Sequence, residues 1–176
     1  SDVCSSDLQT VASDCEGIIE DAHKITEILG KETIIKIPAF EEGFKAMMKL
    51  TEEGIISCGT VVITPMQAYL SAKAGASYVA PYVNRIDSMG YDGVAVVKQI
   101  QDIFDNNGMA CEVMAASFRN SQQVLELCAY GIGLSTVAPD VIRAFVKNAN
   151  IDQSIENFTK DFKDLTGVTS MSELKR

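Results

Sequence analysis

The sequence predicts an α/β fold, in which a parallel sheet is built from strands joined by crossover helices. Short runs of β-branched residues alternate along the chain with segments of helical period, and this rhythm is typical of strand, helix and strand units. The chain has 176 residues, of which 47% are hydrophobic and 22% charged, the composition of an ordinary folded domain. It shows no low-complexity tract or linker, so we expect one domain.

Strands and helices are expected to alternate in six units. The strands are predicted at residues 8–12, 33–37, 55–63, 78–83, 109–115 and 134–137. The helices between them are predicted from their start signals, which are Ser13 or Asp14, Glu41 with Glu42, Thr64 with Pro65, Asp92, Ser121, and Pro139 with Asp140. A last helix is predicted from an apolar stripe of Ile151, Ile155, Phe158, Phe162 and Leu165.

The number of units leaves two architectures open. A closed (β/α)₈ barrel has eight strand-helix units and typically about 250 residues, so two units would be missing here. An open α/β sheet of six strands is the alternative. Residues 1–7 follow neither the strand nor the helix period, and we therefore expect the natural N-terminus to have been lost or replaced.

Charge and cysteine content exclude several functions. The 24 acidic and 15 basic side chains give a net charge of −9, which would repel nucleic acid and anionic membranes. No apolar stretch is long enough to span a bilayer and no signal peptide is recognisable, so we expect a cytoplasmic protein. The five cysteines contain no Cys-x-x-Cys pair, which argues against a disulfide scaffold or a zinc site. His23 is the only histidine, and we interpret it as helix surface.

Lys36 is the residue least expected where it stands. It lies in the apolar strand Ile34-Ile35-Lys36-Ile37-Pro38, and fully buried unpaired lysines are rare. If Ile35 and Ile37 pack beneath helices, the period of two places Lys36 on the inner face, near the carboxyl end of the strand. Desolvation can lower the pKa of a lysine by about 3 to 5 units, which makes its amine a nucleophile and suggests a Schiff base. Alternatively, the head group reaches solvent at a strand edge.

Other polar residues follow the later strands. Thr60 interrupts an apolar run, although a threonine is also common in ordinary strands. Tyr82 and Arg85 follow the fourth expected strand, where a packed aromatic ring and a surface ion pair are the simpler interpretations. Ser117 and Arg119 follow the fifth, and by themselves indicate only a loop.

Taken together, four ordered segments resemble the transaldolase and fructose-6-phosphate aldolase family. They are Ile34-Ile35-Lys36-Ile37-Pro38, Gly59-Thr60, the run from Tyr78 to Asp87, and Ala115-Ala116-Ser117-Phe118-Arg119. The resemblance extends from about Gln9 to the last helix. It implies a (β/α)₈ TIM barrel, here lacking the first two strand-helix units, and chemistry through a lysine Schiff base without a metal or organic cofactor.

The resemblance also implies a role for each site residue. Lys36 would form the imine, Thr60 and Gln9 would position a water molecule, and Tyr82 would be the acid/base partner. Arg85, Ser117 and Arg119 match the positions that bind the sugar phosphate, since guanidinium groups suit phosphate oxygens. The expected partners are small phosphorylated sugars and small ketones, with neither nucleic acid nor membrane.

Two positions favour aldolase over transaldolase activity. Members that transfer a dihydroxyacetone unit resemble one another in having Phe and Glu where this chain has Tyr82 and Gln9. We therefore expect an aldolase that forms or cleaves fructose 6-phosphate, with a transaldolase of the pentose phosphate pathway as the alternative. Arg119 is closer to the transaldolase pattern.

The chain departs from the family pattern at its start. The Asp that ends the family's first strand and the Thr-Thr-Asn-Pro segment of its second are absent, so an inactive fragment that acts as a structural subunit is a further alternative. We expect a non-family stretch at 1–8, barrel units three to eight at 9–149, and a C-terminal helix and tail at 150–176. By resemblance that helix would contact a neighbouring subunit in a pentamer or decamer; otherwise it folds onto its own barrel.

Overall fold

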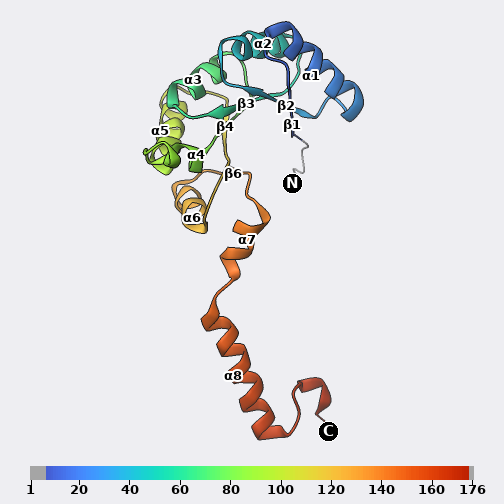
Figure 1. The fold of residues 1–176 in the computed structure, drawn as a ribbon, viewed down its shortest axis with the longest axis vertical. Coiled ribbons are helices and arrows are strands. Elements are labelled where there is room, and N and C mark those ends of the chain that lie inside the picture. Colours follow the sequence, from blue (N-terminus) through green and yellow to red (C-terminus); the bar gives the residue numbers. More distant parts are fainter. Residues whose placement is uncertain (1–6, 175–176) are drawn as a thin grey trace. The chain divides into compact units, whose positions relative to one another are not determined.

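The sheet is parallel throughout and its strands follow one another in chain order. The structure, a computed structural model, describes residues 7–174. The strand order is β1-β2-β3-β4-β5-β6, and each neighbouring pair is parallel (Figure 1). The strands are β1 Asp7–Gln9, β2 Ile34–Pro38, β3 Ser57–Val62, β4 Tyr78–Pro81, β5 Glu112–Ala115 and β6 Leu134–Ser135.

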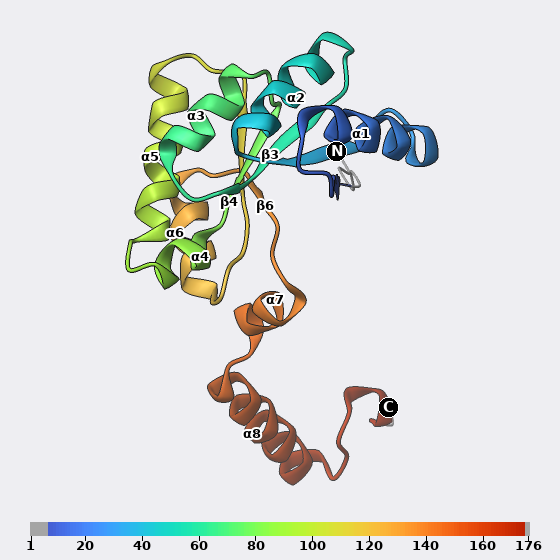
Figure 2. The same ribbon diagram turned by 45° about the horizontal axis from the view of Figure 1, so that its top comes forward.

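Each crossover between strands contains at least one helix. The helices of the sheet unit are α1 Cys15–Leu29, α2 Glu41–Glu52, α3 Pro65–Lys73, α4 Val83–Ser88, α5 Gly93–Asn106 and α6 Ser121–Tyr130. Figure 2 shows α3 and α5 on the same side of β3 and β4, and α3 packs against both α5 and β3. A doubly wound sheet reverses its strand order at a switch point, and this sheet has no reversal among the described strands. The architecture is therefore that of part of a TIM-barrel wall.

The two faces of the sheet have different partners. Ile35 and Ile37 are fully buried in a cluster with residues of α1 and α2, such as Ile18 and Met47. The inner face carries a second apolar cluster of Ile34, Cys58, Ala80 and Ala116. This division confirms the inner and outer faces expected for β2 from the period of two.

The start signals of most helices are confirmed. Asp14 caps α1, Asp92 caps α5, and Thr64 caps α3 in a capping box with Gln67. The cap of α6 is Asn120 rather than the expected Ser121, because the Asn120 side chain accepts the backbone N–H of Gln123 at 3.0 Å.

Each of the six expected strands differs from the observed strand by one to three residues at one or both ends. The fourth strand ends at Pro81 and the chain turns into α4, which the apolar run from Tyr78 to Val83 concealed. The fifth strand begins at Glu112 instead of residue 109. The first strand lies at Asp7–Gln9 instead of 8–12, so Asp7 and Leu8 pair with β2 although they follow no clear period.

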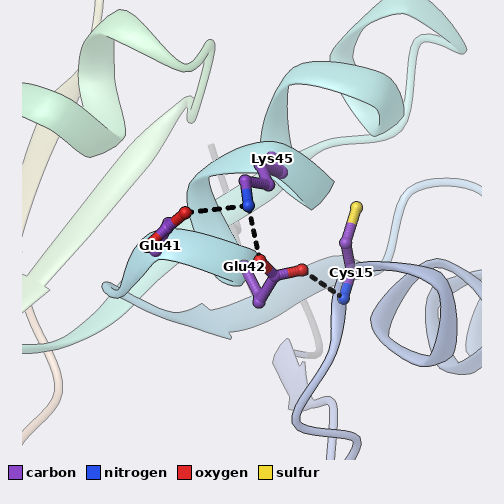
Figure 3. A network of polar contacts seen from close by, with 4 residues as sticks. All are labelled: Cys15, Glu41, Glu42 and Lys45. Carbon is purple, nitrogen blue, oxygen red and sulfur yellow. Dashed lines mark hydrogen bonds and ion pairs between the residues drawn. The ribbon is translucent and has the colours of Figure 1, made fainter.

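A polar network joins the starts of α1 and α2 (Figure 3). Lys45 donates to Glu42 at 2.6 Å and to Glu41 at 2.9 Å, and Glu42 also accepts the backbone N–H of Cys15 at 3.2 Å. The hydrogen bond from Lys45, followed by that from Cys15, lowers the pKa of Glu42. Two consecutive crossover helices are thereby tied together where they leave the sheet.

Two buried thiols make stability dependent on alkaline pH. Burial raises the pKa of Cys58 and that of Cys111 to about 12, from an ordinary 9.0. In the unfolded chain these thiols lose their protons near pH 9, whereas in the folded chain they keep them. The free energy of unfolding is therefore expected to fall between pH 9 and 12, by up to about 1.4 kcal/mol per pH unit for each thiol.

Urea unfolding followed by circular dichroism over this pH range measures the effect. Cys58→Ala and Cys111→Ala should each make the pH dependence shallower, even though each leaves a small cavity. Cys128→Ala is the matched control, because Cys128 is exposed. An unchanged slope in both buried variants would contradict the prediction.

The chain divides into two compact units, one through Ala138 and the other from Pro139 on. The second unit contains α7 Pro139–Val146, α8 Ala149–Thr166 and a 3₁₀ turn at Met171–Glu173. None of the residues of α8 is buried, and Phe158 is 71% exposed. Among residues 7–174, no helix is long and apolar enough to cross a membrane.

Candidate active site

Lys36 lies on the inner face of the sheet. It is two residues beyond Ile34 and pairs in register with Gln9 of β1 and Cys58 of β3. Only 16% of its side chain is exposed, so its amine is largely withdrawn from bulk solvent. Its Nζ lies 2.5 Å from Asp7 Oδ2, and the Asp7 side chain is 32% exposed. Lys36 is the third of the five residues of β2, and its amine contacts the first residue of β1.

Thr60 and Tyr82 form a hydrogen-bonded pair at the ends of β3 and β4. Thr60 is fully buried, and its Oγ1 donates to the Tyr82 hydroxyl at 3.1 Å. Between Gly59 and Val62 the register with β4 shifts, and Val61 has a φ of 56°. A β-branched residue seldom adopts a positive φ, and such strain is often found beside functional sites. A bulge can redirect a side chain, and this one lies next to Thr60, whose hydroxyl bonds to Tyr82.

Arg85 stacks on the same tyrosine. It lies in α4, and its Cζ is 4.9 Å from the centre of the Tyr82 ring. The guanidinium group is exposed, so it can still reach a ligand in solvent. Tyr82 thus has the contacts of an ordinary packed tyrosine, because its hydroxyl and its ring each have a partner. These partners are the buried hydroxyl of Thr60 and the exposed guanidinium of Arg85.

The loop after β5 brings Ser117 and Arg119 to the start of α4. The backbone N–H of Val83 donates to the Ala116 carbonyl at 3.0 Å, and that of Asn84 donates to the Ser117 carbonyl at 2.9 Å. The side chains of Ser117 and Arg119 are exposed. The three predicted phosphate-binding residues are therefore carried by two segments that are bonded to each other.

Gln9 is a neighbour of Lys36 through strand pairing, and the other predicted residues lie on or after later strands. It ends β1, pairs in register with Lys36 and is exposed. Among the described residues, hydrogen bonds join Thr60 to Tyr82 but join neither of them to Gln9 or Lys36. The seven predicted residues lie in or just after consecutive strands, β1 to β5, with Lys36 inside β2, Thr60 inside β3 and the others at or beyond a strand end.

A cavity of about 510 Å³ is lined mainly by the first residues of β1, β2, β4 and β5 and by residues 134–137, in and just after β6. Its lining is mixed, with Ile34, Tyr78 and Met114 among the apolar residues and Ser135 and Thr136 among the polar ones. The Asp7 carboxylate that contacts Lys36 also lines it, as does Glu112. Through Asp7 the Lys36 amine lies at the wall of this cavity, although none of the seven predicted site residues, all within the described part of the chain, lines it.

Sequence reasoning missed three side chains near the site. No pattern indicates Asp7, because residues 1–7 show no period. Asp87 and Gln123, described below, hold the loop that carries Arg119. The spacing of Asn120 and Gln123 resembles a capping box and is the one signal that could have indicated Gln123.

The parallel sheet in chain order, with helices against its outer face and polar side chains on its inner face, defines a class of proteins, the α/β proteins whose sheet has the form of part of a TIM-barrel wall. The family model described as Transaldolase/Fructose-6-phosphate aldolase matches residues 5–173, and the chain belongs to this family. That membership agrees with the resemblance of the four ordered segments.

The similar proteins are named as probable transaldolases. A "Probable transaldolase" of Coprothermobacter proteolyticus is 38% identical over 160 residues, which cover 91% of this chain and 73% of the relative. One of Hydrogenobaculum sp. is 40% identical, with 89% and 71% covered, and one of Thermoplasma volcanium is 35% identical, with 90% and 71% covered.

The fold is also similar to that of a mandelate oxidase mutant whose structure holds a monooxide FMN adduct. The TM-score is 0.57 at 13% sequence identity, and the match covers 94% of this chain and 59% of that one. At this identity the likeness concerns the fold alone.

Proposed function

We propose that this chain carries out class I aldol chemistry on sugar phosphates through an imine on Lys36. The observation that carries the proposal is the mostly buried Lys36 amine on the inner face, two residues before the position of β2 that pairs with Thr60 of the Thr60–Tyr82 pair. The Lys36 amine attacks the keto carbon of dihydroxyacetone, and loss of water leaves an iminium ion. Loss of a proton from the adjacent carbon gives an enamine, which attacks the aldehyde carbon of glyceraldehyde 3-phosphate. Water then hydrolyses the new imine and releases fructose 6-phosphate.

Tyr82 is proposed to exchange the protons of this sequence. Its hydroxyl already accepts a hydrogen bond from Thr60, which leaves its own proton free to be donated toward the inner face. Gln9 and Thr60 would hold the water molecule that relays these protons. Arg85, Ser117 and Arg119 would bind the phosphate, because two cations and a hydroxyl provide a local positive site on an acidic protein.

Reduction with borohydride in the presence of dihydroxyacetone tests the imine directly. We expect a stable adduct on Lys36, which peptide mass spectrometry locates. Without the ketone no adduct should form. A protein that turns over fructose 6-phosphate and still shows an unmodified Lys36 would refute the mechanism.

Transaldolase activity is the second candidate, and the three relatives named "Probable transaldolase" favour it. A transaldolase keeps the dihydroxyacetone unit on the lysine until a second aldehyde arrives. Fructose 6-phosphate supplied with and without erythrose 4-phosphate separates the two activities. Turnover in the absence of erythrose 4-phosphate favours the aldolase, and turnover only in its presence favours the transaldolase.

Tyr82→Phe is expected to shift activity from cleavage toward transfer. The variant keeps the ring on which Arg85 stacks but removes the hydroxyl that would protonate the enamine. We expect the ratio of dihydroxyacetone release to transfer to fall by about tenfold or more. Tyr91→Phe is the control, because it removes the same hydroxyl from an exposed tyrosine in the turn between α4 and α5. An unchanged ratio in Tyr82→Phe would contradict the role assigned to the phenol.

We further propose that the chain functions as a homo-oligomer, a pentamer or decamer. This rests on the apolar residues that α8 leaves exposed, Ile151, Ile155, Phe158 and Leu165. Light scattering measures the assembly directly, and a monomer at micromolar concentration would remove the proposal.

A further inference from the structure

Gln123 is a buried polar residue, and both the oxygen and the nitrogen of its side-chain amide form hydrogen bonds. It is 8% exposed and lies in the first turn of α6. Its Oε1 accepts the backbone N–H of Arg119 at 2.8 Å, and its Nε2 donates to Asp87 Oδ2 at 2.5 Å. Because a backbone N–H can only donate and a carboxylate only accepts, these two partners fix the orientation of the amide.

Asp87 connects this amide to two other helices. Asp87 lies in the last turn of α4, and its Oδ1 accepts the backbone N–H of Gly93 at 2.7 Å, at the start of α5. One carboxylate therefore joins α4, α5 and α6. Asp87 is exposed, so its charge remains hydrated while it accepts from the first turn of α5, an arrangement that also suits the helix dipole.

The loop between β5 and α6 is held at both of its ends. Its first part is bonded to α4 through the Ala116 and Ser117 carbonyls, and Arg119 is bonded through Gln123 to Asp87 of the same helix. Ser117 has a φ of 60°, which is strained for a residue with a side chain and persists only where the surroundings enforce it. Arg85 lies on α4 two residues before Asp87.

We infer that Asp87 and Gln123 are positioning residues, which set Ser117 and Arg119 against Arg85 so that the three converge on a phosphate group. This inference rests on the proposed function, which assigns the phosphate to those three residues. Asp87 and Gln123 touch no ligand themselves. They fix the backbone of one phosphate-binding segment to the helix that carries the other.

Exchanging the two functional groups tests the inference. In Asp87→Asn one hydrogen bond is lost whichever way the new amide turns, because Gln123 and Gly93 both present N–H groups. In Gln123→Glu two carboxylates face each other. In the double variant the introduced asparagine donates to the introduced glutamate and accepts from Gly93, while the glutamate accepts from Arg119, so the whole pattern is restored. Gln122→Glu is the matched control, since this exposed neighbour receives the same added charge outside the network.

The probe is inorganic phosphate, titrated against the full ¹⁵N-labelled chain and followed at the amides of Ser117 and Arg119. We expect Asp87→Asn and Gln123→Glu each to weaken binding by about tenfold or more, and the double variant to bind at least about fivefold more tightly than Gln123→Glu. Gln122→Glu should change binding by less than about threefold.

Asp87→Asn separates positioning from simple electrostatics. Removing a negative charge would by itself strengthen phosphate binding, so weaker binding can come only from the lost geometry. Tighter or unchanged binding in Asp87→Asn, no recovery in the double variant, or no phosphate binding by the unaltered chain would each overturn the inference. Failure of the borohydride adduct with phosphate binding intact would instead reject the imine chemistry and leave the positioning roles standing.

Discussion

Lys36→Met is expected to abolish the borohydride adduct and to lower turnover of fructose 6-phosphate by about 10⁴-fold or more. Methionine has a similar length and no branch, so it can fill the largely buried space of the lysine while removing the amine. The Asp7 carboxylate loses its partner, but it is one-third exposed and water can solvate it. The fold should therefore survive, and circular dichroism with steady-state kinetics measures both effects.

Lys24→Met is the matched control for Lys36→Met. The Lys24 side chain is 65% exposed and pairs with Glu27 on the surface of α1, far from the inner face. It should retain the adduct and full turnover. If Lys36→Met kept more than about one-hundredth of the activity, another group would have to form the imine, and the proposed mechanism would be wrong.

Gly93→Ala is expected to destabilise the fold by about 2–4 kcal/mol. A Cβ added at Gly93 would lie 2.3 Å from the Val83 carbonyl oxygen and 2.9 Å from Asp87 Oδ1. The Asp87 side chain can move, but the Val83 carbonyl belongs to the backbone of α4, so the two helices must separate. Alanine favours a helix over glycine by at most about 1 kcal/mol, which is too little to offset this clash. Urea unfolding gives the free energy.

Gly133→Ala is the control for Gly93→Ala, because nothing lies within 4 Å of a Cβ added at Gly133. It should change the free energy of unfolding by less than about 1 kcal/mol. Equal stability of the two variants would contradict the close approach of α4 and α5. Since a loss of about 2–4 kcal/mol is a large share of the stability of a typical domain, Gly93→Ala should also lower the yield of folded protein.

Much of the fold could be predicted because its signals are local. Thr64, Pro65 and Gln67 form a complete capping box within four residues, and the period of two in β2 identifies both faces of that strand. The helix α4 could not be predicted in this way. Its first residue, Val83, continues an apolar run, and the turn is fixed by hydrogen bonds to Ala116 and Ser117, which are distant in the sequence.

The same distinction between local signals and contacts distant in the sequence applies to the predicted site residues. Lys36 stands out because a charge interrupts an apolar strand, and that signal lies within five residues. The pairing of Thr60 with Tyr82 depends on the bulge at Val61, which no local pattern indicated. Asp87 and Gln123 look like ordinary polar residues on helices until the fold brings their side chains together.

The chain-order arrangement of the sheet has a consequence for how the protein folds. Every strand pairs with the next one along the chain, so each ladder closes over a single crossover and none must wait for a distant segment. Units can therefore be added one after another while the ribosome is still synthesising the chain. The predicted site residues would then be placed one after another, with Lys36 in position before Tyr82 and the segment from Ser117 to Arg119 arriving last.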